Sequence, residues 1–191
     1  MRIIGGTARG KRLASFRGMS IRPTTDKVRE AIFNILSQPF SFKTVLDLFA
    51  GTGAMGIEAL SRGAETAVFV DNDPKAVKLV KKNLELCRFT GRAKIINMDV
   101  QSALTFANKK REGFDLIFID PPYLKSLTAV VLNYIADKKL LNADGVIVAE
   151  SSKRMIWEGE VKGIELFDRR RYGDTVVSFY KSKHTTQGTI T

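Results

Sequence analysis

Hydrophobic positions change their spacing along the chain in a way that predicts alternating strands and helices. Short apolar runs, rich in β-branched and aromatic residues, have the length of buried strands. We expect strands at 44–49, 66–70, 93–97, 114–119 and 145–149. The segments between them have helical spacing, and the best defined follows Asp73, with Val77, Val80, Leu84 and Cys87 as its buried stripe. The other helices are expected at 53–62, 101–109 and 126–137.

The two ends of the chain have different patterns. Residues 161–167 and 175–180 flank the turn-like stretch RRRYGD, which predicts a terminal antiparallel hairpin. Residues 1–22 mix short apolar pairs with glycines, as in a β-hairpin or an extended arm. A helix with apolar positions from Val28 to Leu36 should follow Pro23. We therefore expect a basic arm at 1–22, one domain at 23–183 and a polar, frayed tail at 184–191.

Near-continuous apolar strands alternating with helices predict an α/β fold, in which helices cover both faces of a parallel sheet. Composition agrees, with 44% hydrophobic and 27% charged residues, as in ordinary globular proteins. No apolar run is long enough for a membrane-spanning helix, and no secretory signal is evident. A single cysteine, Cys87, and a single histidine, His184, give no disulfide and no metal-ligand cluster. We expect a cytoplasmic protein without membrane contact or bound metal.

The charge of the chain indicates a class of binding partner. The chain carries a net charge of +11, and residues 1–30, with eight basic and two acidic side chains, account for +6 of it. Such a basic segment is typical of proteins that bind nucleic acid, although a merely solvated basic surface remains the alternative. The residues expected to contact phosphate are Arg2, Arg9, Lys11, Arg12, Arg17 and Arg22. A second basic run, 169–171, fits either another RNA contact or a solvated turn.

A glycine-rich loop joins the first predicted strand to the helix that follows it. Gly51, Gly53 and Gly56 match G-x-G-x-x-G, a spacing that lets a nucleoside cofactor approach the backbone. Asp71 ends the next strand, 20 residues after Gly51, where a carboxylate can accept both ribose hydroxyls. The remaining candidates in these two turns are Phe49, Thr52 and Asn72. A turn without ligand, a dinucleotide site and an S-adenosylmethionine site are the three interpretations.

Two further acids favour S-adenosylmethionine over a dinucleotide. Asp47 lies beside the glycine turn, where it would repel a pyrophosphate but suit a ligand carrying an ammonium and a sulfonium. Asp99 follows the third strand and could accept the adenine amino group while the Val100 N–H donates to the ring. Taken alone, Asp47 could be a structural acid and Asp99 a helix cap.

The most specific motif, Asp120-Pro121-Pro122-Tyr123, ends the fourth strand. Methylation of an exocyclic amine requires both N–H groups to be held, and the Asp120 carboxylate and Pro121 carbonyl are suitable acceptors. Pro122 stiffens the turn, and Tyr123 offers a flat face for stacking on an extruded base. The alternative is a diproline turn with a packing tyrosine.

Together, DLFAGTG, VDND and DPPY resemble the class I, Rossmann-like S-adenosylmethionine-dependent methyltransferases. The stretches MRIIGGTARGKRL, RPTTDKVREAIFNIL and RRYGDTVVSFY are further similar to the bacterial enzymes that methylate guanine N2 in small-subunit (16S) ribosomal RNA. The resemblance covers nearly the whole chain. It implies a seven-stranded sheet whose last strand is antiparallel, an N-terminal extension that contacts RNA, and monomeric action.

The resemblance also implies roles for the motif residues already named: the loop and strand-end acids bind the cofactor, and the DPPY tetrapeptide holds the guanine. The substrate would be ribosomal RNA, free or within an assembling small subunit. Whether Arg22, Thr24 and Arg29 touch a ligand or brace the arm stays open. Rival hypotheses are adenine-N6 methylation of RNA or DNA, protein glutamine methylation, a non-catalytic rRNA-binding assembly factor and an NAD-dependent reductase.

Overall fold

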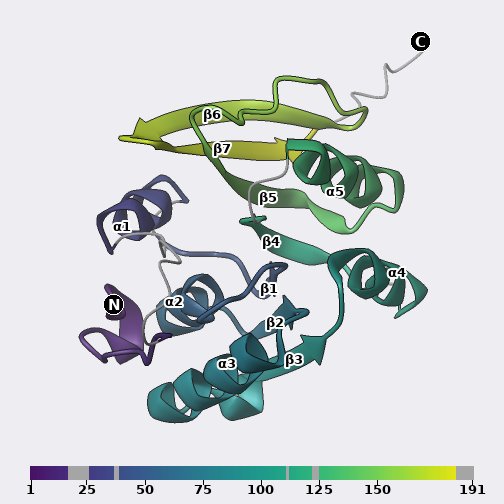
Figure 1. Ribbon diagram of the computed structural model, residues 1–191. Coiled ribbons are helices and arrows are strands. Elements are labelled where there is room, and N and C mark those ends of the chain that lie inside the picture. Colours follow the sequence, from purple (N-terminus) through teal and green to yellow (C-terminus); the bar gives the residue numbers. More distant parts are fainter. Residues whose placement is uncertain (17–25, 37–38, 111, 122–124, 184–191) are drawn as a thin grey trace.

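The computed structural model describes residues 1–16, 26–36, 39–110, 112–121 and 125–183. In these ranges one seven-stranded sheet has the order β3-β2-β1-β4-β5-β7-β6 (Figure 1). The strands are β1 (Thr44–Asp47), β2 (Thr66–Asp71), β3 (Ala93–Asn97), β4 (Phe114–Ile119), β5 (Leu141–Ser152), β6 (Ile164–Tyr172) and β7 (Thr175–Ser182). Strands β1 to β5 pair in parallel, and β7 pairs antiparallel with both β5 and β6. The expected parallel α/β sheet with a terminal antiparallel hairpin is confirmed.

Helices cover both faces of the sheet, as expected from strands that are apolar on both sides. They are α1 (Asp26–Ile35), α2 (Ala54–Arg62), α3 (Pro74–Cys87), α4 (Val100–Lys110) and α5 (Lys125–Asp137). Two short 3-10 turns lie at Gly6–Ala8 and Thr90–Arg92. None of the helices in the described ranges combines the length and low polarity needed to cross a bilayer.

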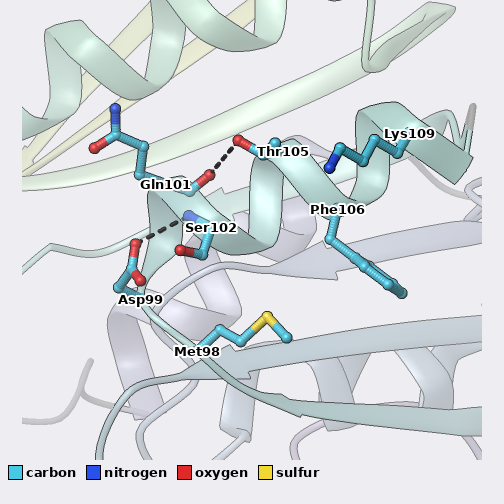
Figure 2. Close-up of a pocket in the computed structure, with 7 residues that line it drawn as sticks. All are labelled: Met98, Asp99, Gln101, Ser102, Thr105, Phe106 and Lys109. Atoms are coloured by element: carbon cyan, nitrogen blue, oxygen red, sulfur yellow. Dashed lines mark hydrogen bonds between the residues drawn. The ribbon is translucent and has the colours of Figure 1, made fainter.

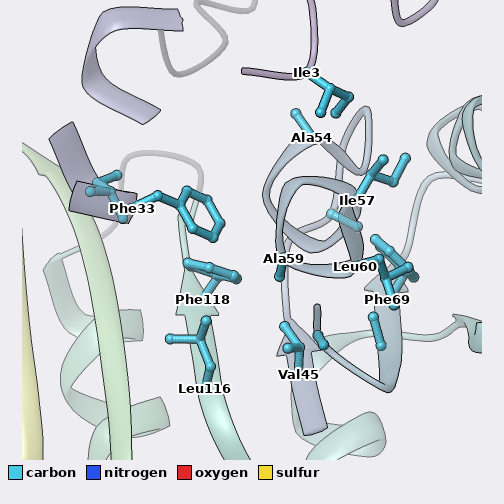
Figure 3. Packing of buried hydrophobic residues seen from close by; sticks show 14 of the residues in the cluster. Ile3, Phe33, Val45, Ala54, Ile57, Ala59, Leu60, Phe69, Leu116 and Phe118 are labelled. Atoms are coloured by element: carbon cyan, nitrogen blue, oxygen red, sulfur yellow. The ribbon is translucent and has the colours of Figure 1, made fainter. Parts of the chain in front are cut away.

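Alternate residues of each strand enter different cores because successive side chains point to opposite faces. On one face, Val45, Phe69 and Phe118 pack beneath α1, α2 and α3 (Figure 3). On the other face, Leu46 and Ile117 pack beneath α4 and α5. The sheet is therefore held between two separate cores, which leaves its carboxyl edge as the place where loops converge.

Three strands differ clearly from the sequence expectation. Strand β6 begins at Ile164 rather than at 161 and runs through most of the expected turn to Tyr172, because β7 pairs with it along this length. Strand β1 ends at Asp47, because the chain turns there, although Leu48 N still donates to the Phe118 carbonyl at 3.1 Å. Strand β5 extends over Leu141–Ser152, well beyond 145–149, because Leu141 pairs with Phe114 of β4 and because β7 pairs with β5 as far as Ser152.

The N-terminal segment, defined here as residues 1–14, folds back on itself against α2 and α3. Ile3 N donates to the Lys11 carbonyl at 2.9 Å and Gly10 N to the Ile3 carbonyl at 2.8 Å, with one isolated bridge between Arg2 and Arg12. The expected hairpin is thus present in a reduced form, with a 3-10 turn at its tip. Ile3 and Leu13 are buried, so the segment is docked on the domain.

Candidate active site

The glycine loop turns sharply between β1 and α2. Gly51 and Gly53 have φ values of 54° and 76°, in the left-handed region that glycine adopts without strain. Gly53 N donates to the Ala50 carbonyl at 2.6 Å, which closes the turn, and the first turn of α2 begins there. A Cβ on Gly56 would overlap the Phe69 ring, so this glycine lets α2 lie close on β2. The three glycines therefore have the structural roles that the motif predicts.

Asp47 ends β1 directly beneath this loop. Its side chain is buried, and Oδ2 accepts a hydrogen bond from Gly56 N at 3.1 Å. Burial raises the pKa of Asp47 to about 7, against the opposing effect of the Gly56 hydrogen bond, and the like charge of Asp71 raises it further. A cation placed beside Asp47 would favour its ionised form.

Asp71 ends β2 and fixes the glycine loop from the side. Its Oδ2 accepts from Gly51 N at 2.8 Å, and its Oδ1 accepts from Asp73 N at 2.9 Å. Each oxygen still has a free lone-pair direction, so two hydroxyls of a ligand can be added. The neighbouring candidate Asn72 is exposed, while Phe49 and Thr52 are half-buried in the adjacent turn.

Asp99 follows β3 and begins α4. Its Oδ1 accepts from Ser102 N at 2.9 Å (Figure 2), a bond that lowers the pKa of this exposed carboxyl. Val100, the first residue of α4, is half-buried. Asp99 is therefore the helix cap that was one of its two interpretations.

An open groove of about 410 Å³ lies beside Asp99 along α4 (Figure 2). Its lining residues are Met98, Asp99, Gln101, Ser102, Thr105, Phe106 and Lys109. This groove continues the row of strand ends away from the glycine loop, and it offers both an apolar and a polar wall.

Asp120 follows β4, and its neighbour across the sheet is Glu150, since Ile119 pairs with Ala149 in β5. The pKa of Asp120 is raised well above its usual value, by desolvation and by the like charges of Glu150 and Asp47. Because Asp120 is exposed to solvent, the like charges explain this shift better than loss of hydration does. Pro121 is half-buried beside it, whereas Pro122 and Tyr123 lie outside the described residues.

Strand order brings five carboxylates into one row. Along the carboxyl edge the strands β3, β2, β1, β4 and β5 carry, in turn, Asp99, Asp71, Asp47, Asp120 and Glu150. Neighbouring strands lie about 4.8 Å apart, so this row concentrates negative charge around the glycine loop. Within the described ranges no three His, Cys, Asp or Glu side chains are grouped to hold a metal. The row instead fits an organic cation spread along the edge.

The basic candidates of the N-terminal segment lie on its outer side. Arg2, Arg9 and Arg12 are exposed, and the Arg2 Nε lies 3.9 Å from Asp26 Oδ2. Lys11 Nζ donates to the Leu86 carbonyl at 3.2 Å. The other candidates, Arg17 and Arg22, together with Thr24, lie outside the described residues.

Two buried polar residues hold this segment: Glu58, which sequence reasoning missed, and Arg29, whose role it left open. Glu58 of α2 is fully buried and accepts from Ile4 N and Gly5 N, both at 2.8 Å. Arg29 is also fully buried, pairs with Glu58 at 3.5 Å and donates to the Arg2 carbonyl. Arg29 therefore braces the segment, which resolves its two possible roles.

The basic run 169–171 is also largely committed to the fold. Arg169 donates to Ser178 Oγ and to the Trp157 carbonyl, both at 3.1 Å. Arg170 pairs with Asp168 at 3.0 Å. Arg171 donates to the carbonyl of Gly173 in the hairpin turn at 3.0 Å. These contacts stabilise the terminal hairpin and the loop before it.

Comparison with known proteins gives this architecture a family. Residues 1–181 match the family model described as "Conserved hypothetical protein 95". The putative rRNA methyltransferase YlbH of Bacillus subtilis is 42% identical over 96% of this chain and 100% of its own length. Ribosomal RNA small subunit methyltransferase D of Escherichia coli is 36% identical over 79% of this chain and 74% of its own.

A solved structure shares the fold in detail. The putative methyltransferase yhhF from Escherichia coli superimposes with a TM-score of 0.83 and 29% identity, covering 96% of this chain and 98% of that one. The seven-stranded order and the glycine loop at its centre are thus those of the class I methyltransferase fold. On these grounds the chain belongs to the conserved hypothetical protein 95 family, alongside ribosomal RNA small subunit methyltransferase D.

Proposed function

We propose that the protein is an S-adenosylmethionine-dependent methyltransferase that modifies the exocyclic N2 amine of a guanine in small-subunit (16S) ribosomal RNA. The observation that carries this proposal is the row of five carboxylates around the glycine loop of a protein whose net charge is +11. Crowding like charges at one edge is electrostatically unfavourable, and a cationic cofactor and a base amine would offset this repulsion. The names of the relatives supply the substrate class.

The residues around the glycine loop fit S-adenosylmethionine in charge and in hydrogen-bonding capacity. Asp47 would face its ammonium and sulfonium, and Asp71 would accept the ribose hydroxyls. Asp99 would accept from the adenine amine, with the Val100 N–H as the matching donor. A Cβ on Gly51 would enter open space beside the loop, so this glycine lets a ligand approach the backbone closely. Phe49, Thr52 and Asn72 would complete the walls.

On the substrate side, the Asp120 carboxylate and the Pro121 carbonyl would accept the two N–H groups of the guanine amine. Holding both turns the nitrogen lone pair toward the methyl donor. When bound, S-adenosylmethionine supplies the electrophilic methyl group. The amine then loses one proton, and the raised pKa of Asp120 suits this carboxylate to take it. Pro122 would stiffen the turn, and Tyr123 would stack on the base.

The N-terminal segment would hold the phosphates of the RNA. Arg2, Arg9, Lys11 and Arg12 lie along its outer side, and Arg17 and Arg22 follow in the chain. Contacts of this kind give affinity that depends on salt and carry no sequence information. Sequence-specific recognition of RNA targets unpaired bases, so an accessible loop guanine is the expected target.

Methyl transfer from labelled S-adenosylmethionine tests the proposal. Naked 16S rRNA, assembled small subunits, 23S rRNA and duplex DNA are offered in parallel to the wild type and to Asp120→Ala. We expect label in one or both small-subunit substrates and none with Asp120→Ala. Label only in DNA would refute the RNA assignment, and full activity of Asp120→Ala would refute the assigned chemistry.

A further inference from the structure

Asn83 of α3 is a fully buried side chain that joins two regions with different proposed roles. Its Oδ1 accepts from Ala14 N at 2.8 Å, and its Nδ2 donates to the Ala14 carbonyl at 3.1 Å. The same Nδ2 donates to the Thr52 carbonyl, in the glycine loop, at 2.8 Å. One acceptor and two donors of the amide are thus all engaged, so the side chain has one possible orientation.

Other contacts join the same two regions at the same point. The Thr52 hydroxyl donates to the Met1 sulfur at 4.0 Å, and Leu13 N donates to the Met1 carbonyl at 3.2 Å. Val80, one turn before Asn83, lies 3.3 Å from the position of a Cβ on Gly53. The N-terminal segment, α3 and the glycine loop therefore meet at Asn83 without a solvent layer between them.

We propose that Asn83 is a positioning residue that couples cofactor binding at the glycine loop to RNA binding by the N-terminal segment. This inference rests on the proposed function. A cofactor that fixes the Thr52 carbonyl fixes the Asn83 amide, which in turn fixes the backbone of Ala14. Arg12, two residues before Ala14 and paired with Arg2 across the bridge, is thereby held in place for phosphate. Linkage requires the reverse effect as well, so bound RNA tightens cofactor binding equally.

Hydrogen exchange in the wild-type protein tests this link without any substitution. S-adenosylhomocysteine is added to saturation, and exchange is followed in the peptide spanning residues 8–16. We expect exchange of this peptide to slow several-fold, because opening of the segment now also requires opening of the loop. Unchanged exchange on binding of the ligand overturns the inference.

Two variants distinguish a coupling role of Asn83 from general anchoring of the N-terminal segment. Asn83→Ala removes the link to Thr52, and the slowing by ligand should vanish. Ser61→Ala is the matched control, because Ser61 Oγ accepts from Ala8 N at 2.9 Å and donates to the Gly5 carbonyl at 2.6 Å but does not contact the loop. Ser61→Ala should raise the basal exchange rate and keep the slowing. Slowing that persists in Asn83→Ala contradicts the assignment.

Affinity for a 16S rRNA transcript gives the functional readout. With S-adenosylhomocysteine present, wild type and Ser61→Ala should bind the transcript about fivefold or more tightly than without it, which is the usual lower range of coupling between sites. The affinity of Asn83→Ala for the transcript should not change when the ligand is added. If Asn83→Ala does not fold, Asn83→Asp keeps the acceptor for Ala14 N but as a carboxylate cannot donate to Thr52. Calorimetry of the wild type distinguishes failure of the proposed function from failure of this inference. If S-adenosylhomocysteine does not bind, the proposed function is wrong. If it binds but does not change the affinity for RNA, only the role of Asn83 is wrong.

Discussion

Asp47→Asn removes the most strongly buried charge of the candidate site while preserving its shape. The asparagine Oδ1 can still accept from Gly56 N, which Asp47 Oδ2 contacts at 3.1 Å. We expect the variant to be more stable than the wild type at neutral and alkaline pH, and to lose affinity for S-adenosylmethionine. A gain in stability with a loss of binding is the signature of a carboxylate kept for its ligand.

The magnitude follows from the pKa. Asp47 titrates at about 7 in the folded protein and at 3.8 as an ordinary carboxyl, so between these values the folded state holds a proton that the unfolded chain has lost. The stability associated with this group is complete below the lower value and is lost as the pH rises through the upper one. At ~1.4 kcal/mol per pKa unit the loss is about 2 kcal/mol near pH 5 and about 4 kcal/mol near pH 8. Replacement by asparagine removes this dependence.

Urea unfolding of both proteins without ligand, near pH 5 and near pH 8, measures the effect. Any packing cost of the asparagine is the same at both pH values, so it cancels in the comparison. The free energy of unfolding of Asp47→Asn, relative to wild type, should rise by about 2–3 kcal/mol between the two. An equal difference at both pH values would refute the raised pKa and, with it, the reasoning that the site is built for a cation.

Four further substitutions test the catalytic turn and the N-terminal segment. Asp120→Ala should lower methyl transfer by about 10²–10⁴-fold, to below detection in the labelling and mass-spectrometric assays, and retain binding of S-adenosylmethionine, as calorimetry can show. Arg12→Ala should weaken RNA binding and reduce the slope of log affinity against log salt by about one, and an unchanged slope would remove this residue from the interface. Gly6→Ala should cost about 2 kcal/mol or more in urea unfolding, because its φ is 73° and a Cβ would overlap the Ser61 carbonyl. Gly10→Ala, with φ at 83° but open space around it, should cost about 1 kcal/mol from backbone strain alone.

The fold was predictable because its information is local. Each parallel strand is a short apolar run, each is followed by a helical pattern, and Asp73 and Pro74 mark the start of α3, with Asp73 Oδ1 accepting from Lys75 N at 2.8 Å. Strand length was less predictable, since β5 begins at Leu141, before an irregularity in its pairing with β4, and continues to Ser152 along β7. Pairing partners that are distant in sequence decide such boundaries.

The residues of the candidate site also differ in how far the sequence predicts them. Asp47, Asp71, Asp99 and Asp120 were predictable because each is at or directly after the end of a strand, and parallel strands end at one edge. Glu150 carries the same signal, since it directly follows the strand expected at 145–149, and it was missed because no motif marks it. The pairing of Ile119 with Ala149 places it beside Asp120.

Buried polar residues were the largest omission. On α3 the apolar pattern predicts burial of Val77, which is half-buried, and gives no signal for Asn83, which is fully buried. The partners of Asn83 and of Glu58 are backbone groups more than 30 residues away, so the reason for burying them exists only in the folded chain. A polar side chain satisfied by distant backbone cannot be recognised from local periodicity.

In the proposed function, the row of carboxylates binds the methyl donor and the Asp120-Pro121 turn holds the N2 amine of guanine for methylation. Mass spectrometry of nucleosides from 16S rRNA, methylated by the purified protein as free RNA or as small subunits, tests it most directly. The account predicts N2-methylguanosine at a single position, absent from the Asp120→Ala reaction. N6-methyladenosine as the product, or no modified nucleoside from either substrate, would contradict it.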